Sequence, residues 1–566
     1  MGKFSENALS VLRARYLRKD DTGRIIETPD EMFRRIARAL ASVEERYAGN
    51  VDLCRERFYE FLSSLRFLPN SPALMHAGVP NGQLAACFVL PVEDNMASIF
   101  ETLKNAALIL QSGGGTGFSF SRLRPAADPV HTTGGVASGP VSFMKIYNTA
   151  TEVVKQGGAR RGANMGILSI DHPDIIDFIR LKRDHAELAN FTISVAVTDA
   201  FMEAVRLDSD FPLINPRTGK AVKSLRARQV FDELAESAWA SGDPGVVFID
   251  RINEANPTPH LGTFEATNPC GEQPLLPYEA CILGSLNMPF YVREGAIDYM
   301  ALGDDIALAV RMLDNAIDAN HYPLREIARM HKGTRKIGLG VMGWADTLIL
   351  LGIPYDSPEA VAKARRVMRF IQESAHHVSE ELAEERGPFP YFTGSVYERT
   401  GTPPRRNATL TTIAPTGTLS IIADCSSGIE PLYALAFKRR VLDTEMVEVN
   451  RHFIGIARRE GFYSEKLMEC VMAHGTVSGQ RSVPLSFRRL FRTAHEINYA
   501  AHIEMQAAFQ QFTDNAVAKT INLPHRATRE TVGRAFHMAF DKRLKGLAVF
   551  RAGTKPGALG KLNDSD

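Results

Sequence analysis

The chain has 566 residues, with 66 Lys and Arg against 65 Asp and Glu, six cysteines, and 45% hydrophobic residues. A net charge of +1 argues against a dedicated nucleic-acid-binding protein, and six cysteines are too few for a disulfide scaffold, so we expect a cytoplasmic location. The longest apolar stretch, residues 337–354, contains Asp346 and four glycines, which argues against a transmembrane helix or a membrane partner.

The first 65 residues are predicted to form a charged, helical region. Thr28 is a candidate helix N-cap, because Pro29 follows at the first helical position and Glu31 completes the spacing of a capping box. No Ser/Gly-rich or Pro-rich linker and no internal repeat divides the sequence.

The long middle of the chain alternates short β-rich runs with helical patterns. Residues 167–170 precede a helix from Ile175, and residues 191–197 precede a helix that starts near Asp199. Residues 336–342 lead into another helix at Trp344. This rhythm predicts a largely parallel sheet covered by helices, and one extended barrel-like domain explains the missing linkers better than four separate units.

Glycine is concentrated in three places, at residues 112–117, 134–135 and 157–158. A backbone without side chains can approach a ligand closely there, although tight turns have the same composition. None of these clusters has the G-x-G-x-x-G spacing of a dinucleotide-binding fingerprint.

A second candidate for ligand binding is the segment 414–420, which follows a predicted strand at 409–413. Threonine, glycine and serine at the start of a helix offer amide groups and hydroxyls to a phosphate, but an ordinary N-cap has the same composition. The run Asn70, Ser71, Pro72 is a weaker candidate of the same kind.

The six cysteines, at positions 54, 87, 270, 281, 425 and 470, form no C-x-x-C motif, and we predict no metal site. Most isolated cysteines are inert core residues. Cys270 differs because two prolines and a glycine rigidify its loop and place it between Asn268 and Glu272. A carboxamide and a carboxylate beside a thiol are parts of a general-base site.

Residues 268–272, with the sequence NPCGE, resemble the finger loop of ribonucleotide reductases, in which the cysteine carries a transient thiyl radical. Further segments look like blocks of that family in family order. They are FLPNSPALM at 67–75, CFVLPV at 87–92, GGVASGP at 134–140, RRGANMG at 160–166, CILGSLN at 281–287 and PTGT at 415–418. The resemblance covers about residues 1–550.

The detailed sequences of these blocks resemble those of the adenosylcobalamin-dependent (class II) enzymes. Class I catalytic subunits carry a Tyr-Tyr pair near the C-terminus, whereas the corresponding residues 519–524 here are KTINLP. Class III enzymes carry a glycyl-radical motif, which residues 549–554 do not match. The resemblance therefore implies adenosylcobalamin as the cofactor, although the chain has no D-x-H-x-x-G cobalamin motif.

The resemblance also implies roles for individual residues. Cys270 would abstract the ribose 3′ hydrogen, Glu272 would take the 3′-hydroxyl proton, and Asn268 would hydrogen-bond the 2′ and 3′ hydroxyls. Cys87 and Cys281 would form the dithiol that reduces the substrate. The predicted substrate-binding residues are Ser71, Ala86, Cys87, Gly115, Asn268, Pro269, Cys270, Gly271, Glu272, Thr416, Gly417, Thr418, Leu419 and Ser420.

The implied fold is a ten-stranded α/β barrel with a central finger loop. We expect a helical region at 1–65, the barrel at 66–550 and a short tail without cysteines at 551–566. A thiyl radical must be shielded from water, which fits a loop inside a closed barrel.

Family members are dimers whose choice of substrate is set by a deoxynucleoside triphosphate effector. The effector loop would include Arg160 and Arg161, for which an inert basic turn is the alternative. The short N-terminus predicts that dATP does not shut off activity. Because no cysteine follows Cys470, we expect a small dithiol or a separate tail-bearing polypeptide to reduce the enzyme, and thioredoxin alone to work poorly.

Two alternatives stay open at this point. One is a class I catalytic subunit that depends on a radical-generating partner. The other is a non-catalytic nucleotide-binding regulator that kept the fold. The substrates are predicted to be ribonucleotides, and diphosphates are favoured over triphosphates.

Overall fold

The computed structural model describes residues 4–130, 134–154, 162–183, 187–441, 444–554 and 559–560. The chain starts with helices, as predicted. In order they are α1 (Glu6–Val11), a π-helical turn (Leu12–Tyr16), α2 (Pro29–Ala41), a 3₁₀ turn (Ser42–Tyr47) and α3 (Val51–Ser63). The predicted capping box is present, because Thr28 and Glu31 each accept a hydrogen bond from the backbone N–H of the other. The proposed domain limits at residues 65 and 550 stay a prediction.

A sheet of ten strands occupies the centre of the molecule. The strands are β1 (Phe67–Pro69), β2 (Cys87–Leu90), β3 (Gly115–Ser119), β6 (Asn164–Ser169), β7 (Phe191–Val197), β10 (Gly245–Phe248), β13 (Ala280–Asn287), β16 (Ile337–Met342), β19 (Thr520–Leu523) and β20 (Gly546–Arg551). Their order is β1, β13, β2, β3, β6, β7, β10, β20, β19, and β16 pairs with the other edge of β13.

The sheet closes into a barrel made of parallel sets. β2, β3, β6, β7 and β10 run parallel, as do β13 with β16 and β19 with β20. The sets join antiparallel where β13 meets β2 and where β10 meets β20. Isolated bridges from Leu339 to Thr411 and from Ile413 to Val517 complete the ring between β16 and β19. The predicted strand at 409–413 therefore contributes isolated bridges rather than a regular strand.

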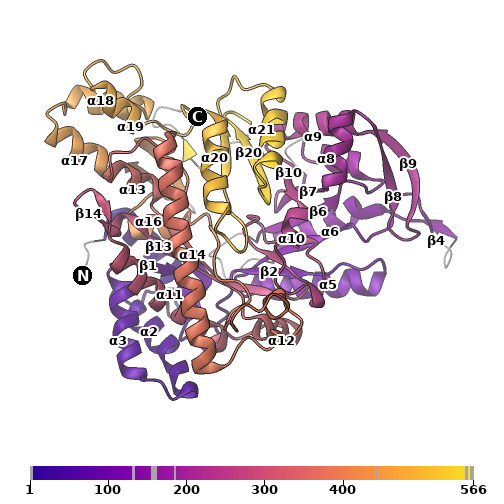
Figure 1. Ribbon diagram of the computed structural model, residues 1–566, viewed down its shortest axis with the longest axis horizontal. Helices are drawn as coiled ribbons and strands as arrows, with labels where there is room; N and C mark the ends of the chain where they lie inside the picture. Colours follow the sequence, from indigo (N-terminus) through magenta and orange to yellow (C-terminus); the bar gives the residue numbers. More distant parts are fainter. Residues whose placement is uncertain are drawn as a thin grey trace.

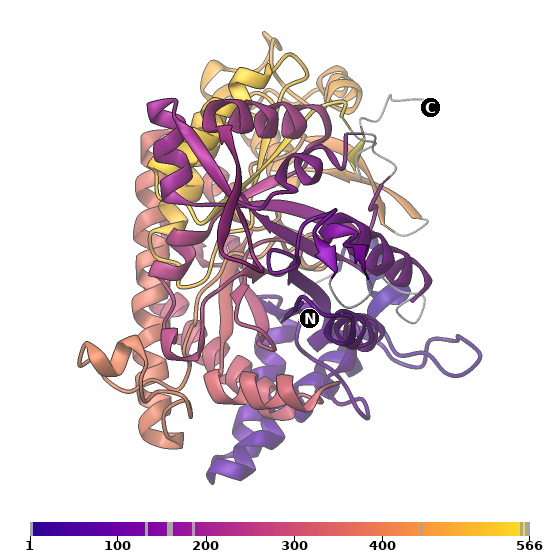
Figure 2. The same ribbon diagram turned by 90° about the vertical axis from the view of Figure 1, so that its right-hand side faces the viewer.

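Helices surround this barrel, and the long helix α14 runs from top to bottom through the middle of Figure 1 and along the left edge of Figure 2. The main ones are α5 (Met96–Gln111), α6 (Gly139–Val153), α9 (Ala227–Ser241), α11 (Tyr299–Ala319), α14 (Pro358–Arg386), α20 (Tyr499–Gln510) and α21 (Arg529–Asp541). The predicted alternation of strand and helix is confirmed where β7 precedes α8 (Asp199–Leu207) and β16 precedes α13 (Trp344–Leu350). Among the described residues, no helix is both long and apolar enough to cross a membrane.

The inside of the barrel is filled by a short hairpin, β11 (Ala266–Thr267) and β12 (Pro274–Leu275). Side chains on the strands alternate, so that Phe88 and Ile282 pack outward while Cys87 and Cys281 join a smaller inner cluster with the hairpin. Glycine makes room for the hairpin, because a Cβ on Gly117 would lie 1.8 Å from the carbonyl oxygen of Thr267. The hairpin is the predicted finger loop.

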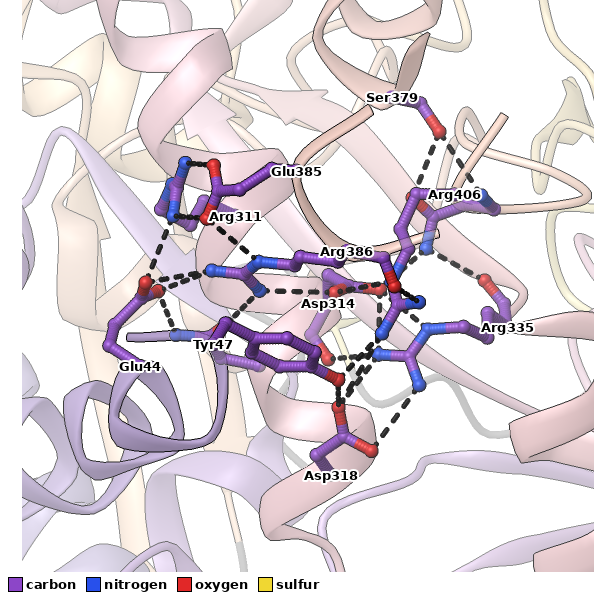
Figure 3. A network of polar contacts seen from close by, with 12 residues as sticks. Glu44, Tyr47, Arg311, Asp314, Asp318, Arg335, Ser379, Glu385, Arg386 and Arg406 are labelled. Carbon is purple, nitrogen blue, oxygen red and sulfur yellow. Dashed lines mark hydrogen bonds and ion pairs between the residues drawn. The ribbon is translucent and has the colours of Figure 1, made fainter. Parts of the chain in front are cut away.

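A buried ionic network joins the N-terminal helices to the barrel (Figure 3). Its charged members are Arg311, Arg335, Arg386, Arg406, Glu44, Asp314, Asp318 and Glu385. Arg386 spans the boundary, with Glu44 of the 3₁₀ turn at 2.7 Å and Asp314 of α11 at 3.3 Å. Tyr47 donates its hydroxyl proton to Asp318 at 2.9 Å. The network therefore fixes the N-terminal helices on α11 and α14.

Candidate active site

The tip of the finger loop presents Cys270 to a cavity inside the barrel. Gly271 lies in the left-handed region at φ +81°, which turns the chain sharply, and its N–H donates to the carbonyl of Asn268 at 3.0 Å. The backbone of Glu272 is held by the opposite wall of the barrel. Its carbonyl oxygen accepts hydrogen bonds from the Ala516 N–H at 2.9 Å and from the Thr412 hydroxyl at 3.0 Å. Cys270 is exposed, whereas Glu272 and Asn268 are buried.

Cys87 and Cys281 are far apart in sequence and adjacent in space. They stand opposite each other in the antiparallel pairing of β2 with β13. Directly opposed antiparallel residues have Cα atoms about 4.5–5.5 Å apart, a separation that a disulfide can bridge. The carboxamide of Asn268 donates to Cys87 Sγ at 3.2 Å, which links the pair to the finger loop.

Burial dominates the electrostatics of these two thiols. It raises the pKa of both Cys87 and Cys281 well above the ordinary value for cysteine. Glu272 adds to this rise at Cys87, while the Asn268 hydrogen bond opposes it. Both residues therefore rest as protonated thiols rather than as thiolates.

The cavity, of about 270 Å³, brings together most of the predicted substrate-binding residues. Those that line it are Ser71, Ala86, Cys87, Gly115, Asn268, Pro269, Cys270, Glu272, Thr416, Gly417, Thr418 and Leu419. Gly271 is not part of the lining, and Ser420 lines a neighbouring cavity instead. Cys281 stands beside Cys87 on the neighbouring strand and is not part of the lining.

The segment predicted to bind phosphate forms one end of the cavity. Thr416 adopts a left-handed conformation at φ +53°, and its hydroxyl accepts from the Gly428 N–H at 2.7 Å. Helix α16 (Leu419–Ala423) starts directly after the turn. The turn is thus held in place by the chain that follows it.

Two lining residues come from the N-terminal helices and were missed by the sequence analysis. Arg15 donates to the Thr418 hydroxyl at 3.3 Å, and the Tyr16 hydroxyl lies 2.8 Å from Ser71 Oγ. A basic and an aromatic residue in a charged helical segment gave no signal of a site. Their role depends on long-range packing of the π-helical turn against the barrel.

A larger cavity of about 760 Å³ lies on the other side of α16. Its lining includes Ser420 and Ile421 of that helix, and Thr520 and Asn522 of the stretch 519–524. His452 also lines it; burial lowers the pKa of its imidazole, and its Nε2 has no hydrogen-bond partner among the described residues. The cavity is mixed in character, with hydroxyl, carboxamide and apolar groups and with the charged side chains of Asp346, Asp424, Glu430, Glu448 and Arg451.

The other residues singled out in the sequence either lie apart from the substrate-binding cavity or lie outside the described residues. Arg160 and Arg161, the predicted effector loop residues, lie outside the described residues. Cys54 and Cys470 lie away from both cavities, and Cys425 lines the larger one, where burial raises its pKa.

The sequence of this chain matches the models of a known protein family. The ribonucleotide reductase barrel domain matches residues 85–550, and the all-alpha domain of ribonucleotide reductase matches residues 2–82. Two similar relatives are vitamin B12-dependent ribonucleoside-diphosphate reductases. The one from Thermoplasma acidophilum is 48% identical, over 98% of this chain and 79% of its own length. The one from Mycobacterium tuberculosis (strain H37Rv) is 49% identical, with the same coverage of 98% and 79%.

A solved structure shares the fold. The class Id ribonucleotide reductase alpha subunit of Actinobacillus ureae superposes with a TM-score of 0.81 at 22% sequence identity, covering 97% of each chain. At that identity the likeness concerns the fold alone.

Proposed function

The chain belongs to the ribonucleotide reductase family, and from that premise we propose that it reduces ribonucleoside diphosphates to 2′-deoxyribonucleotides with adenosylcobalamin as its radical source. The relatives at 48% and 49% identity carry both the diphosphate substrate and the dependence on vitamin B12 in their names. The observation that carries the proposal is that Cys270, Glu272, Asn268 and Cys87 share one cavity, with Cys281 opposite Cys87 on the neighbouring strand.

The proposed reaction uses these residues in sequence. Cys270, as a thiyl, removes the 3′ hydrogen atom, and Glu272 accepts the 3′-hydroxyl proton while Asn268 holds the hydroxyls. The 2′-hydroxyl leaves as water. Cys87 and Cys281 supply two electrons and two protons and become a disulfide, after which Cys270 returns the 3′ hydrogen. The balance is one ribonucleotide and one dithiol to one deoxyribonucleotide, one water and one disulfide.

The opposite end of the cavity suits the phosphates of the substrate. The turn at 416–418 presents hydroxyls and backbone amides, and Arg15 places a guanidinium beside the Thr418 hydroxyl. Guanidinium groups pair well with phosphate oxygens. We assign Arg15 to the phosphates, which the sequence analysis did not.

We propose that the larger cavity receives the cofactor in part, because 760 Å³ is too small for the whole of it. Adenosylcobalamin carries many amide side chains on a bulky ring, and the hydroxyl and carboxamide groups of Ser426, Ser427 and Asn522, together with the carboxylates of the lining, can hydrogen-bond such amides. When bound, the cofactor supplies the radical equivalent that the Cys270 thiol needs. The lining residues would orient it and keep water out.

Several features of the proposal concern partners. We propose a cytoplasmic homodimer whose base preference responds to a deoxynucleoside triphosphate through the loop around Arg160 and Arg161. Reduction of the Cys87–Cys281 disulfide would come from a small dithiol or from a separate tail-bearing polypeptide, because the pair is buried.

An anaerobic assay with and without adenosylcobalamin tests the proposal. We expect deoxynucleotide formation from a ribonucleoside diphosphate only with the cofactor, and none from Cys270→Ala. Cys470→Ala is the matched control, because Cys470 lies outside both cavities, and it should behave as wild type. Product without cobalamin, or product from Cys270→Ala, would contradict the proposed function.

A further inference from the structure

The inside of the barrel contains an ion pair that the proposed reaction does not use. Lys336 Nζ lies 2.6 Å from Glu279 Oε2, and both side chains are 0% exposed. Glu279 also accepts the N–H of Leu276 at 2.7 Å, and the ammonium lies 4.6 Å from the ring centre of Phe264. Moving a charged pair out of water costs several kcal/mol per ion, and an apolar pair of the same size is often as stable. The pair therefore calls for a reason other than stability.

Strand register places the lysine beside Cys281. β13 and β16 pair in parallel starting at Ile282 with Ile337, so Cys281 and Lys336 are the residues just before that first pair. Ile282 and Ile337 both pack outward. Leu283 and Gly338 both face inward, since a Cβ on Gly338 would meet Leu283 Cδ2 at 2.5 Å. By alternation, Cys281 and Lys336 lie side by side on the inner face, on strands about 4.8 Å apart.

Access decides which sulfur of the disulfide is attacked. Cys87 lines the substrate cavity and Cys281 does not, so an incoming thiolate reaches Sγ of Cys87. The attack forms a bond to Cys87, breaks the Cys87–Cys281 bond, and leaves the electron pair on Cys281 as a buried thiolate. Burial raises the pKa of Cys281, which makes it a poor leaving group, and the Lys336 cation opposes that rise.

We propose that Lys336, held in place by Glu279, is the positioning residue that stabilises the Cys281 thiolate when the Cys87–Cys281 disulfide is reopened. The second thiol of the reductant then attacks the mixed disulfide on Cys87 and releases it. The two protons of the dithiol end on Cys87 and Cys281. The enzyme disulfide is thus reduced to two thiols, and the dithiol is oxidised to a disulfide. This inference rests on the proposed pairing of Cys87 with Cys281.

The test measures re-reduction directly, after nucleotide and cobalamin have been removed. Wild type and each variant are first oxidised by one turnover, and peptide mapping locates the disulfide. The rate of its reduction by dithiothreitol is then followed by thiol labelling. In Lys336→Met we expect this rate to fall about tenfold or more, because a leaving thiol with a higher pKa departs more slowly. Lys336→Gln, which keeps a polar end for Glu279, gives the same test in a milder form should Lys336→Met not fold.

Two further variants separate charge from structure. Lys182→Met removes another buried lysine, paired with Asp243 at 3.2 Å, and should be reduced within about twofold of the wild-type rate. Glu279→Gln takes away the anion that holds Lys336 in place, so its rate should fall as well, by no more than that of Lys336→Met. The inference fails if Lys336→Met and Lys336→Gln match wild type, or if Lys182→Met slows equally. A wild-type enzyme that forms no Cys87–Cys281 disulfide would instead overturn the proposed function.

Discussion

Two buried polar regions meet back to back at Arg335 and Lys336. Arg335 belongs to the ionic network under the N-terminal helices, where it pairs with Asp314 at 2.8 Å and Asp318 at 2.9 Å (Figure 3). Lys336 points the other way, into the barrel, where Glu279 is its ion-pair partner. Gln273 on the finger loop side has neither amide atom hydrogen-bonded among the described residues.

The difference lies in how completely the charges are satisfied. Burial alone would raise the pKa of Asp318, but the Arg335 guanidinium holds it below its ordinary value. In the barrel, by contrast, burial prevails and raises the pKa values of both thiols. A fully satisfied buried network rigidifies a fold, whereas polar groups left partly unsatisfied are characteristic of functional sites. We therefore expect substitutions in the ionic network to lower the free energy of unfolding and substitutions inside the barrel to lower the rate of turnover.

The largest expected effect on stability is that of Asp314→Ala. Asp314 is fully buried and pairs with Arg335, Arg386 and Arg406. Removing it leaves buried cations short of an anion, so we expect the free energy of unfolding to fall by about 3–5 kcal/mol, measured by urea denaturation. Glu101→Ala, which breaks the exposed pair with Lys104, should cost less than about 1 kcal/mol. Similar losses in the two variants would remove the distinction between the regions.

The next effect depends on pH. His331 lies between the two regions, with Nε2 at 2.9 Å from the Lys336 carbonyl oxygen, and burial lowers its pKa from 6.5 to about 4. In the unfolded chain His331 binds a proton below about pH 6.5, whereas in the folded chain it binds one only below about pH 4. Its contribution to stability is complete above pH 6.5 and falls by about 3 kcal/mol as the pH drops to 4.

His331→Gln should flatten that part of the stability profile. The matched control is His377→Gln, because the side chain of His377 is 73% exposed on α14, and it should retain the slope of the wild type. A wild-type slope in His331→Gln would show that other groups cause the acid sensitivity.

The smallest expected effect in free energy is on turnover, and it comes from a change inside the barrel. In Gly117→Ala the new Cβ would lie 1.8 Å from the Thr267 carbonyl oxygen, so the finger loop must shift. A displacement of about 1 Å can cost roughly 100-fold in rate, and we expect that loss in turnover together with a fall of about 1–3 kcal/mol in the free energy of unfolding. In Gly455→Ala nothing lies within 4 Å of the new atom, and activity should be unchanged. Full activity in Gly117→Ala would mean that the loop position is not critical.

The sequence predicted local features well and contacts across the fold poorly. The capping box at Thr28 and the boundary between β7 and α8 follow from nearby residues, and the structure has both. Only the family resemblance predicts the pairing of Cys87 with Cys281, and the register of β2 with β13 brings the two residues together. Arg15 reaches the cavity because a π-helical turn packs on the barrel, which no local pattern encodes.

Other differences have the same cause. The segment 409–413 was predicted as a strand because it is β-rich, yet its neighbours offer isolated bridges. The inward direction of Lys336, next to the outward-facing Arg335, depends on the barrel's closure and on the register of β16 with β13. A list of charged residues along the sequence could not separate the two.

The most direct test of the account is a single anaerobic turnover of fully reduced enzyme with adenosylcobalamin and a ribonucleoside diphosphate, followed by disulfide mapping. We expect one deoxynucleotide for each Cys87–Cys281 disulfide formed, with Cys270 still a thiol at the end. Deoxynucleotide without that disulfide, or with a disulfide between other cysteines, would contradict it.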